Sequence, residues 1–321
     1  MSYLSTFISS EHEENKRRAL FNGARLFSLG GKEFYFAYNP SLMVLKEGIN
    51  KNLYEIEKIL NRLGPSIKKE YEHSCLLEEV KASCSLDGYP FLRRLEGLYL
   101  TNKPLVAENR LTPIKNLSIN AGFSVSSPFK NKEDIEAGMS SLKELSEKLL
   151  KEDVLIGTLI EHFAFEYVHP YQKMNGLIGR HLVYQNLKDS IYEFLGARFS
   201  CSFIDDKKKY FIAFKRSEFS FDLNEYLELI CESLLNELNK IREDLETKEK
   251  RWNACLARLH SLHLRHGQFE TLKGLLMMKV FKKQKLNLTR LAKVLNKSER
   301  TVFRHMSMFK PLNLGSLDTP K

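Results

Sequence analysis

The sequence contains no hydrophobic run long enough to form a membrane-spanning helix. No stretch approaches the roughly 18 consecutive apolar residues that such a helix requires. The first residues, MSYLSTFISSEHEENKRR, also lack the basic segment and apolar core that are typical of a secretory signal peptide. Both absences argue against a membrane or secreted protein, so we expect a globular protein in the cytoplasm.

Cysteine is scarce and shows no ligand-like spacing. The five cysteines are scattered, and no two of them form a C-x-x-C pair. This pattern predicts neither a disulfide framework nor a zinc site. We therefore expect no metal held by cysteine, and free thiols at Cys75, Cys84, Cys201, Cys231 and Cys255.

Excess positive charge is missing from most of the chain. Residues 1–247 carry 33 lysines and arginines against 36 acidic residues, whereas residues 248–321 carry 17 against four. The overall charge of +10 therefore originates entirely in the C-terminal quarter. A basic segment of this kind is typical of a region that contacts nucleic acid, although it can also be a solvated surface.

Helical periodicity dominates the rest of the sequence. Apolar residues recur at intervals of three and four, and Gly64-Pro65 separates two such segments. Pro170 ends a later helix, because proline cannot donate to the preceding turn. The sequence thus predicts a mainly α-helical protein, with helices at residues 40–63, 65–86, 132–150 and 152–168, a further helix from Asn175 or Gly176, and one or two helices over residues 224–266.

In one short segment the apolar residues instead recur at every second position. Leu117, Ile119, Phe123 and Val125 alternate around Asn120-Ala121-Gly122, which predicts a β-hairpin. We expect this hairpin to be the only sheet.

The basic C-terminal segment carries the pattern of a helix-turn-helix. Thr289 can cap a helix that ends at Leu295, and Ser298 can cap a second helix through Phe309. If residues 288–309 bind DNA, Glu299 and two arginines lie near base edges while lysines neutralise phosphates. Alternatively the two helices only pack against the rest of the protein. The candidate DNA-binding residues are Lys297, Arg300 and Arg304.

Residues 169–180, HPYQKMNGLIGR, have the composition of an anion-binding loop. Asn-Gly-x-x-Gly at a helix start presents backbone N–H groups at the positive end of the helix dipole. Arg180, about one turn into that helix, can bind the same anion. His169, across the loop, can accept a proton from a hydroxyl that attacks a bound phosphate. An ordinary structural turn remains the alternative.

The same residues resemble the signature loop of the Fic family, usually H-P-F-x-[DE]-G-N-G-R-x-x-R. The entering helix, LIGTLIEHFAFEYVHPY, is similar too, and the resemblance covers residues 40–240. It implies a Fic-like helical domain with a small hairpin flap that fixes a target segment by strand addition. It also implies transfer of AMP from ATP to a Ser, Thr or Tyr hydroxyl of a target protein.

The resemblance assigns a role to each matching residue. His169 is the general base and Asn175 holds the α-phosphate. The amides of Gly176 to Gly179 form the anion hole, and Arg180 binds the outer phosphates.

Three residues depart from the family pattern. Lys173 replaces the acidic residue that anchors magnesium, Met174 replaces a glycine, and Leu177 replaces an arginine. Lys173 and Arg180 together still supply positive charge for a triphosphate. Transfer itself is less favoured, because an ammonium group only partly replaces a metal at the breaking phosphate bond. A bound magnesium is therefore compatible with the loop but lacks its usual ligand.

A second motif lies upstream. Ser83-Cys84-Ser85-Leu86-Asp87-Gly88 resembles the inhibitory motif [ST]-x-x-x-E-[GN] of many Fic proteins, with Asp87 in place of glutamate. The resemblance implies that Ser83, Asp87 and Gly88 belong to an inhibitory segment in which Asp87 restrains Arg180. Asp-Gly is also a common helix exit, which is the alternative interpretation.

These patterns predict three segments: an N-terminal helical region (1–100), a Fic-like core (101–240), and a long connecting helix with the basic helix-turn-helix (241–321). The first functional hypothesis is a self-inhibited protein adenylyltransferase that uses ATP and is impaired by its loop substitutions. The second is a catalytically inactive nucleotide-binding or DNA-binding regulator. The expected partners are a hydroxyl-bearing target protein and, through residues 288–309, DNA. A homo-oligomer is compatible with the sequence, and a membrane partner is not expected.

Overall fold

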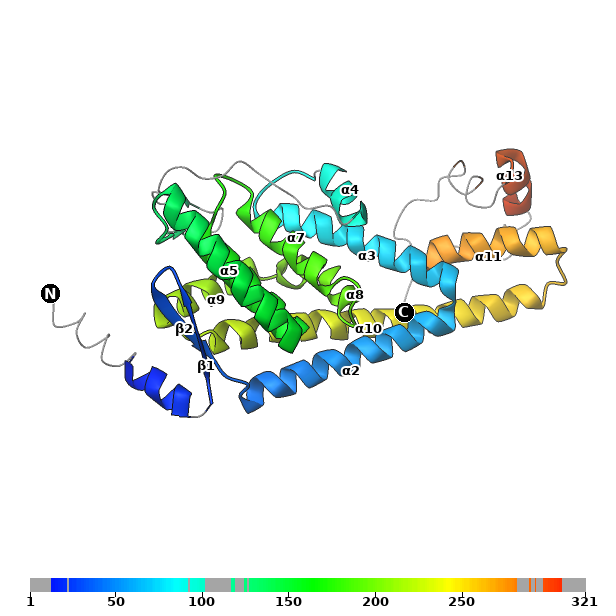
Figure 1. Ribbon diagram of the computed structural model, residues 1–321. Coiled ribbons are helices and arrows are strands. Elements are labelled where there is room, and N and C mark those ends of the chain that lie inside the picture. The colour runs from blue at the N-terminus through cyan, green and yellow to red at the C-terminus, as the bar shows by residue number, and fades with distance from the viewer. Residues whose placement is uncertain are drawn as a thin grey trace. The chain divides into compact units, whose positions relative to one another are not determined.

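The computed structural model divides the chain into two compact units (Figure 1). It describes residues 13–21, 23–91, 93–101, 117–118, 124–125, 127–281, 289, 292 and 297–307. Unit 1 comprises the described residues up to Glu55 together with Cys75–Lys240, and unit 2 comprises Ile56–Ser74 together with those from Ile241 onward. The unit boundaries fall within long helices, and the predicted three-segment division stays a prediction.

The helices of the first half begin and end where the sequence indicates. Helix α2 spans Pro40–Leu63 and α3 spans Pro65–Leu86. Gly64 lies between them with a φ of 93°, a left-handed conformation that glycine adopts without steric cost. Gly88, with a φ of 74°, follows the end of α3 in the same conformation. Both breaks therefore arise from the glycines seen in the sequence.

Three helices form the centre of unit 1. Helix α5 (Lys132–Glu152) and helix α7 (Asn175–Leu187) both pack against α6 (Val154–Val168). Asn131 and Asp153 cap α5 and α6, because their side chains accept hydrogen bonds from Asp134 N and Ile156 N. Most of α6 is buried, including Leu155, Leu159 and Phe163. Helix α6 is therefore the central support of the loop that follows it.

The remaining helices complete the two units. Residues 224–266 contain one whole long helix and the first residue of the next, because a bend that includes His263, with a φ of 46°, separates the two. No helix among the described residues is both long enough and apolar enough to cross a membrane. The other elements are α4 (Arg93–Thr101), α8 (Glu193–Gly196), the 3-10 helix η1 (Ser200–Phe203), α9 (Lys207–Ser220), α10 (Asn224–His260), α11 (His266–Phe281) and α13 (Glu299–Ser307).

The predicted hairpin is present, but it is not the only sheet. Strands β3 (Leu117–Ser118) and β4 (Ser124–Val125) pair antiparallel, with Leu117 opposite Val125; residues 119–123 lie outside the described residues. A second antiparallel pair joins β1 (Arg25–Leu29) to β2 (Lys32–Phe36). The expectation of a single sheet was therefore wrong. Gly30 and Gly31, both at positive φ, make the turn that the sequence analysis overlooked.

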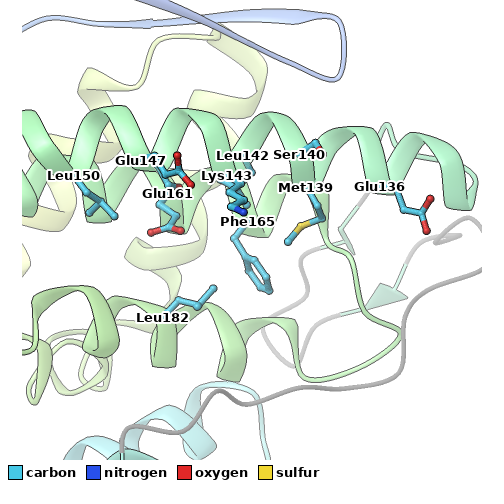
Figure 2. Close-up of a pocket in the computed structure, with 11 residues that line it drawn as sticks. Glu136, Met139, Ser140, Leu142, Lys143, Glu147, Leu150, Glu161, Phe165 and Leu182 are labelled. Atoms are coloured by element: carbon cyan, nitrogen blue, oxygen red, sulfur yellow. The ribbon is translucent and has the colours of Figure 1, made fainter.

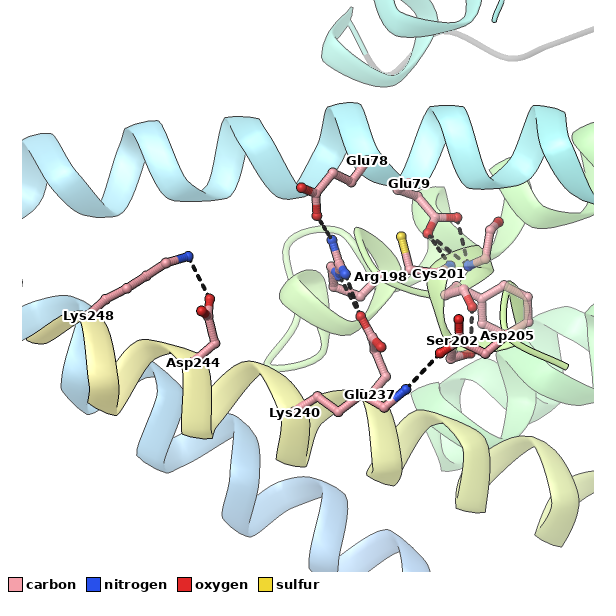
Figure 3. A network of polar contacts seen from close by, with 12 residues as sticks. Glu78, Glu79, Arg198, Cys201, Ser202, Asp205, Glu237, Lys240, Asp244 and Lys248 are labelled. Atoms are coloured by element: carbon pink, nitrogen blue, oxygen red, sulfur yellow. Dashed lines mark hydrogen bonds and ion pairs between the residues drawn. The ribbon is translucent and has the colours of Figure 1, made fainter. Parts of the chain in front are cut away.

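A polar network holds the C-terminal half of α3 within unit 1 (Figure 3). Arg198 pairs with Glu78 of α3 and with Glu237 of α10. The carboxylate of Glu79, fully buried, accepts hydrogen bonds from the backbone N–H groups of Ser200, at 2.8 and 2.9 Å, and Cys201, at 3.3 Å. Because a broken buried ion pair is costly, these contacts fix the end of α3 that carries the second sequence motif.

Candidate active site

The loop begins where α6 ends at His169. The backbone of His169 is left-handed, with a φ of 52°, and its N–H donates to Phe165 O. Left-handed geometry is uncommon for a residue other than glycine and often marks a functional position. Only 13 % of the His169 side chain is exposed. The histidine is therefore held at the helix end by its own backbone, with most of its ring covered.

A pair of hydrogen bonds closes the loop on itself. The side-chain oxygen of Asn175 accepts from Tyr171 N at 2.9 Å, and its amide nitrogen donates to Tyr171 O at 2.7 Å. Asn175 is almost completely buried. Both ends of the amide that was predicted to hold the α-phosphate thus bind the main chain of the loop.

The N-terminus of α7 has the features of an anion site. Met174 precedes the helix in a left-handed conformation, with a φ of 69°, and no side chain caps the helix. A Cβ at Gly176 would lie 2.7 Å from Arg180 Nη1 and 2.7 Å from Asp87 Oδ2. Only glycine fits this position while both groups are present. Lys173 is exposed to solvent and Leu177 is buried in the core.

Arg180 is the most constrained charged residue of the loop. It is 1 % exposed, and its Nε donates to Ser83 Oγ and its Nη2 to Ser83 O, both at 2.9 Å. Nη2 also pairs with Asp87 Oδ2 at 3.0 Å. Burial by itself lowers the pKa of Arg180, but Asp87, Tyr210 and Glu166 together raise it above its ordinary value, so the guanidinium stays charged. The structure therefore brings the two sequence motifs, 97 residues apart, into direct contact.

A second cation binds the same helix end. Lys207 Nζ donates to Ser85 O at 2.6 Å, next to the Ser83 carbonyl that Arg180 occupies. The last carbonyl groups of a helix lack intrahelical donors and carry partial negative charge. Arg180 and Lys207 together satisfy two of them, so the end of α3 is held by positive charge on both α7 and α9.

Among solved structures, the chain is similar to the crystal structure of a Fic family protein from Desulfovibrio desulfuricans G20. The match covers 84 % of this chain and 87 % of that chain, with 17 % sequence identity and a TM-score of 0.51. The chain has a Fic-like fold. No family model matches the sequence, and no curated protein matches it. The likeness therefore establishes the mainly helical architecture with its hairpin, at an identity too low to carry the activity with it.

The Fic-like fold also contains a largely buried carboxyl group, 17 % exposed, that the sequence analysis did not single out. Glu166 lies one turn before His169 on α6, with Oε2 3.8 Å from His169 Nδ1. Burial raises the pKa of Glu166 to about 8; Arg180 lowers it and Asp87 raises it. In sequence this residue looks like one more position on a helical face. Glu166 lies three residues before His169, and this spacing was the signal in the sequence that could have identified it.

A cavity lies elsewhere in the Fic-like core, lined by residues of α5, α6 and α7 (Figure 2). It has a volume of about 700 Å³, and none of the residues 169–180 lines it. Phe165 and Leu182 contribute apolar surface, while Glu147 and Glu161 contribute carboxylates. The cavity therefore does not coincide with the loop.

Within unit 2, the predicted DNA-binding residues do not share one environment. Arg300 and Arg304 are both exposed and lie one turn apart on α13. Lys297 Nζ instead donates to Gly267 O at 2.5 Å and to Thr271 Oγ1 at 2.9 Å. Of the first predicted helix, only Thr289 and Ala292 are described, and both are helical. The side chains of the two arginines are thus exposed to solvent, whereas Lys297 donates hydrogen bonds to α11.

The described residues contain no cluster of three or more His, Cys, Asp or Glu side chains that could hold a metal ion. The loop position that anchors magnesium in the family is occupied by the exposed Lys173. The residues described here do not fit a magnesium ion held in the family manner. The uncapped helix N-terminus and the Gly176 position, in contrast, do fit phosphate groups.

Proposed function

We propose that this protein is a self-inhibited Fic-type adenylyltransferase, which transfers AMP from ATP to a Ser, Thr or Tyr hydroxyl of a target protein. The observation that carries the proposal is the Asp87–Arg180 ion pair beside the N-terminus of α7. Arg180 is buried beside a helix N-terminus that suits an anion, and a carboxylate at the end of another helix pairs with it. This arrangement fits a phosphate-binding site that the protein's own carboxylate blocks. The likeness to a Fic family protein supports the same interpretation.

In the proposed reaction, the target hydroxyl attacks the α-phosphorus of ATP. The new bond joins the hydroxyl oxygen to phosphorus, and pyrophosphate leaves with the electron pair of the broken bond. His169 takes the hydroxyl proton, while the backbone N–H groups at the start of α7 stabilise charge on the phosphate. Arg180 binds the outer phosphates once Asp87 has released it. The loop substitutions reduce the rate of AMP transfer, because Lys173 replaces the residue that anchors magnesium in the family and Leu177 replaces an arginine.

Labelled ATP tests which group is transferred. We expect the Asp87→Gly protein to incorporate label from the α-phosphate of ATP into a protein hydroxyl, its own or that of a target. Label on the γ-phosphate should not be incorporated, because it leaves with pyrophosphate. Incorporation of the γ-label alone would show phosphoryl transfer and would refute the proposed activity.

The exposure of Arg300 and Arg304 favours a second function, a DNA-binding regulator that no longer transfers AMP. Both arginines lie on the face of α13 away from Val302, which is buried. Residues 248–321 also carry the chain's excess positive charge, with 17 lysines and arginines against four acidic residues. In this alternative, α13 contacts DNA and the loop only binds nucleotide.

Salt dependence of DNA binding distinguishes this alternative. We expect binding to duplex DNA to fall steeply as salt rises, and Arg300→Ala to weaken it by about 1–3 kcal/mol, because a contact to a base edge is lost. Arg251→Ala, which removes an exposed arginine from α10, is the matched control. Binding that is absent, or insensitive to salt and to Arg300→Ala, would leave α13 with a structural role.

A further inference from the structure

Glu166 occupies a position that only a small neighbour permits. A Cβ at Gly179 would lie 2.7 Å from Glu166 Oε1 and 2.9 Å from His162 Nδ1. Both atoms are buried and have no hydrogen-bond partner in the part of the chain that the structure describes. A buried carboxyl oxygen without a partner is costly, so its retention calls for a functional reason. Gly179 thus serves two purposes: it belongs to the loop, and it leaves space for Glu166.

The opposite oxygen of Glu166 faces the proposed base. Oε2 lies 3.8 Å from His169 Nδ1, and closing this gap by about 1 Å would form a hydrogen bond. The two residues are three positions apart across the last turn of α6, where side chains are neighbours. A carboxyl group next to one imidazole nitrogen determines which nitrogen carries the proton.

The groups around Glu166 keep it protonated in this state. Burial is the largest cause of its raised pKa, about 8, and Asp87 adds to it while Arg180 opposes it. His162 is neutral, because burial lowers its pKa to about 3, and its Nε2 lies 2.7 Å from Tyr210 Oη. The ionisable groups that face Glu166 are His162 of α6, His169 at the end of that helix, Arg180 of α7, Asp87 after α3, Tyr210 of α9 and Tyr226 of α10.

We propose that Glu166 is a positioning residue whose proton decides whether His169 can act as the base; this rests on the adenylyl transfer proposed above. A protonated Glu166 donates to His169 Nδ1, so the imidazole proton sits on Nε2 and that nitrogen cannot accept another. An ionised Glu166 accepts from Nδ1–H, so Nε2 carries no proton and can take that of the target hydroxyl. In this change the proton of Glu166 passes to His169 Nδ1 and the proton on Nε2 passes to solvent, so one N–H bond forms, one N–H and one O–H bond break, and one proton is released.

The Asp87–Arg180 contact then restrains the site in two ways. It occupies the arginine that would bind phosphates, and its negative charge favours the protonated form of Glu166. Loss of Asp87 therefore lowers the pKa of Glu166, and the move of the His169 ring proton from Nε2 to Nδ1 then occurs at lower pH. In the resting protein the active tautomer appears only as the pH rises through about 8.

The test follows the ring nitrogens of His169 by NMR in the full-length protein, labelled with ¹⁵N-histidine. His169→Gln identifies the signal among the nine histidines. We expect the ring proton to move from Nε2 to Nδ1 with a midpoint near pH 8, and the midpoint to fall in Asp87→Ala. In Glu166→Gln the transition should disappear. It should persist in Glu161→Gln, which changes another carboxyl of α6, one that accepts a hydrogen bond from Asn186 of α7.

A His169 tautomer that does not change between pH 6 and 9, or a transition that survives Glu166→Gln, would overturn the proposal. If Glu166→Gln does not fold, the pH midpoint of the His169 transition in Asp87→Ala decides. A midpoint equal to that of the unaltered protein would contradict the effect of Asp87 on Glu166. None of these readouts requires AMP transfer. Failure of the proposed activity and failure of the Glu166 proposal are therefore distinguishable.

Discussion

Replacement of His169 by alanine in the Asp87→Gly protein is expected to slow AMP transfer by about 10²–10⁴-fold, the usual contribution of a general base. Without the imidazole, the attacking hydroxyl must lose its proton to water. Intact-mass spectrometry of the protein incubated with ATP and magnesium follows the gain of one AMP with time.

His263→Ala in the same background is the matched control, because His263 is exposed in the bend between α10 and α11. This control should transfer AMP at the rate of the Asp87→Gly protein. Equal rates for the His169 and His263 variants would remove His169 from the proposed mechanism.

Arg180→Ala is expected to lower the free energy of unfolding by about 3–5 kcal/mol, as the loss of one partner of a buried ion pair does. The guanidinium is 1 % exposed and makes two hydrogen bonds to Ser83 besides its pair with Asp87. The same variant should lose measurable ATP affinity. Urea unfolding monitored by circular dichroism gives the change in stability.

Arg216→Ala provides the comparison within unit 1. Arg216 pairs with Glu225 at 2.5 Å, but both side chains are largely exposed, so the loss should be below about 1 kcal/mol. Equal and small losses for the two arginine variants would show that the contacts of Arg180 do not hold the loop to α3.

Much of the architecture could be predicted because its signals are local. Gly64-Pro65 separates α2 from α3, and Pro170 follows the end of α6, for reasons that depend on adjacent residues alone. The β1–β2 hairpin was equally local, since Gly30-Gly31 stands between two short segments rich in aromatic and aliphatic residues, but the signal was overlooked.

The site was predictable only in part, because side-chain partners depend on the tertiary fold. Nothing in the sequence indicates that Lys297 binds Gly267 O, and charge alone suggested a phosphate ligand. The pairing of Asn175 with the Tyr171 main chain was equally hidden. The raised pKa of Glu166 requires burial by several helices, which helical periodicity does not reveal.

The central claim is that Asp87 keeps Arg180 from binding phosphates, and calorimetric measurement of ATP affinity tests it most directly. We expect Asp87→Ala to bind ATP at least about tenfold more tightly than the unaltered protein, a difference of about 1.4 kcal/mol. Asp205→Ala, which removes an exposed carboxylate paired with Lys240, should leave the affinity unchanged. An affinity that is the same in all three proteins would contradict the claim.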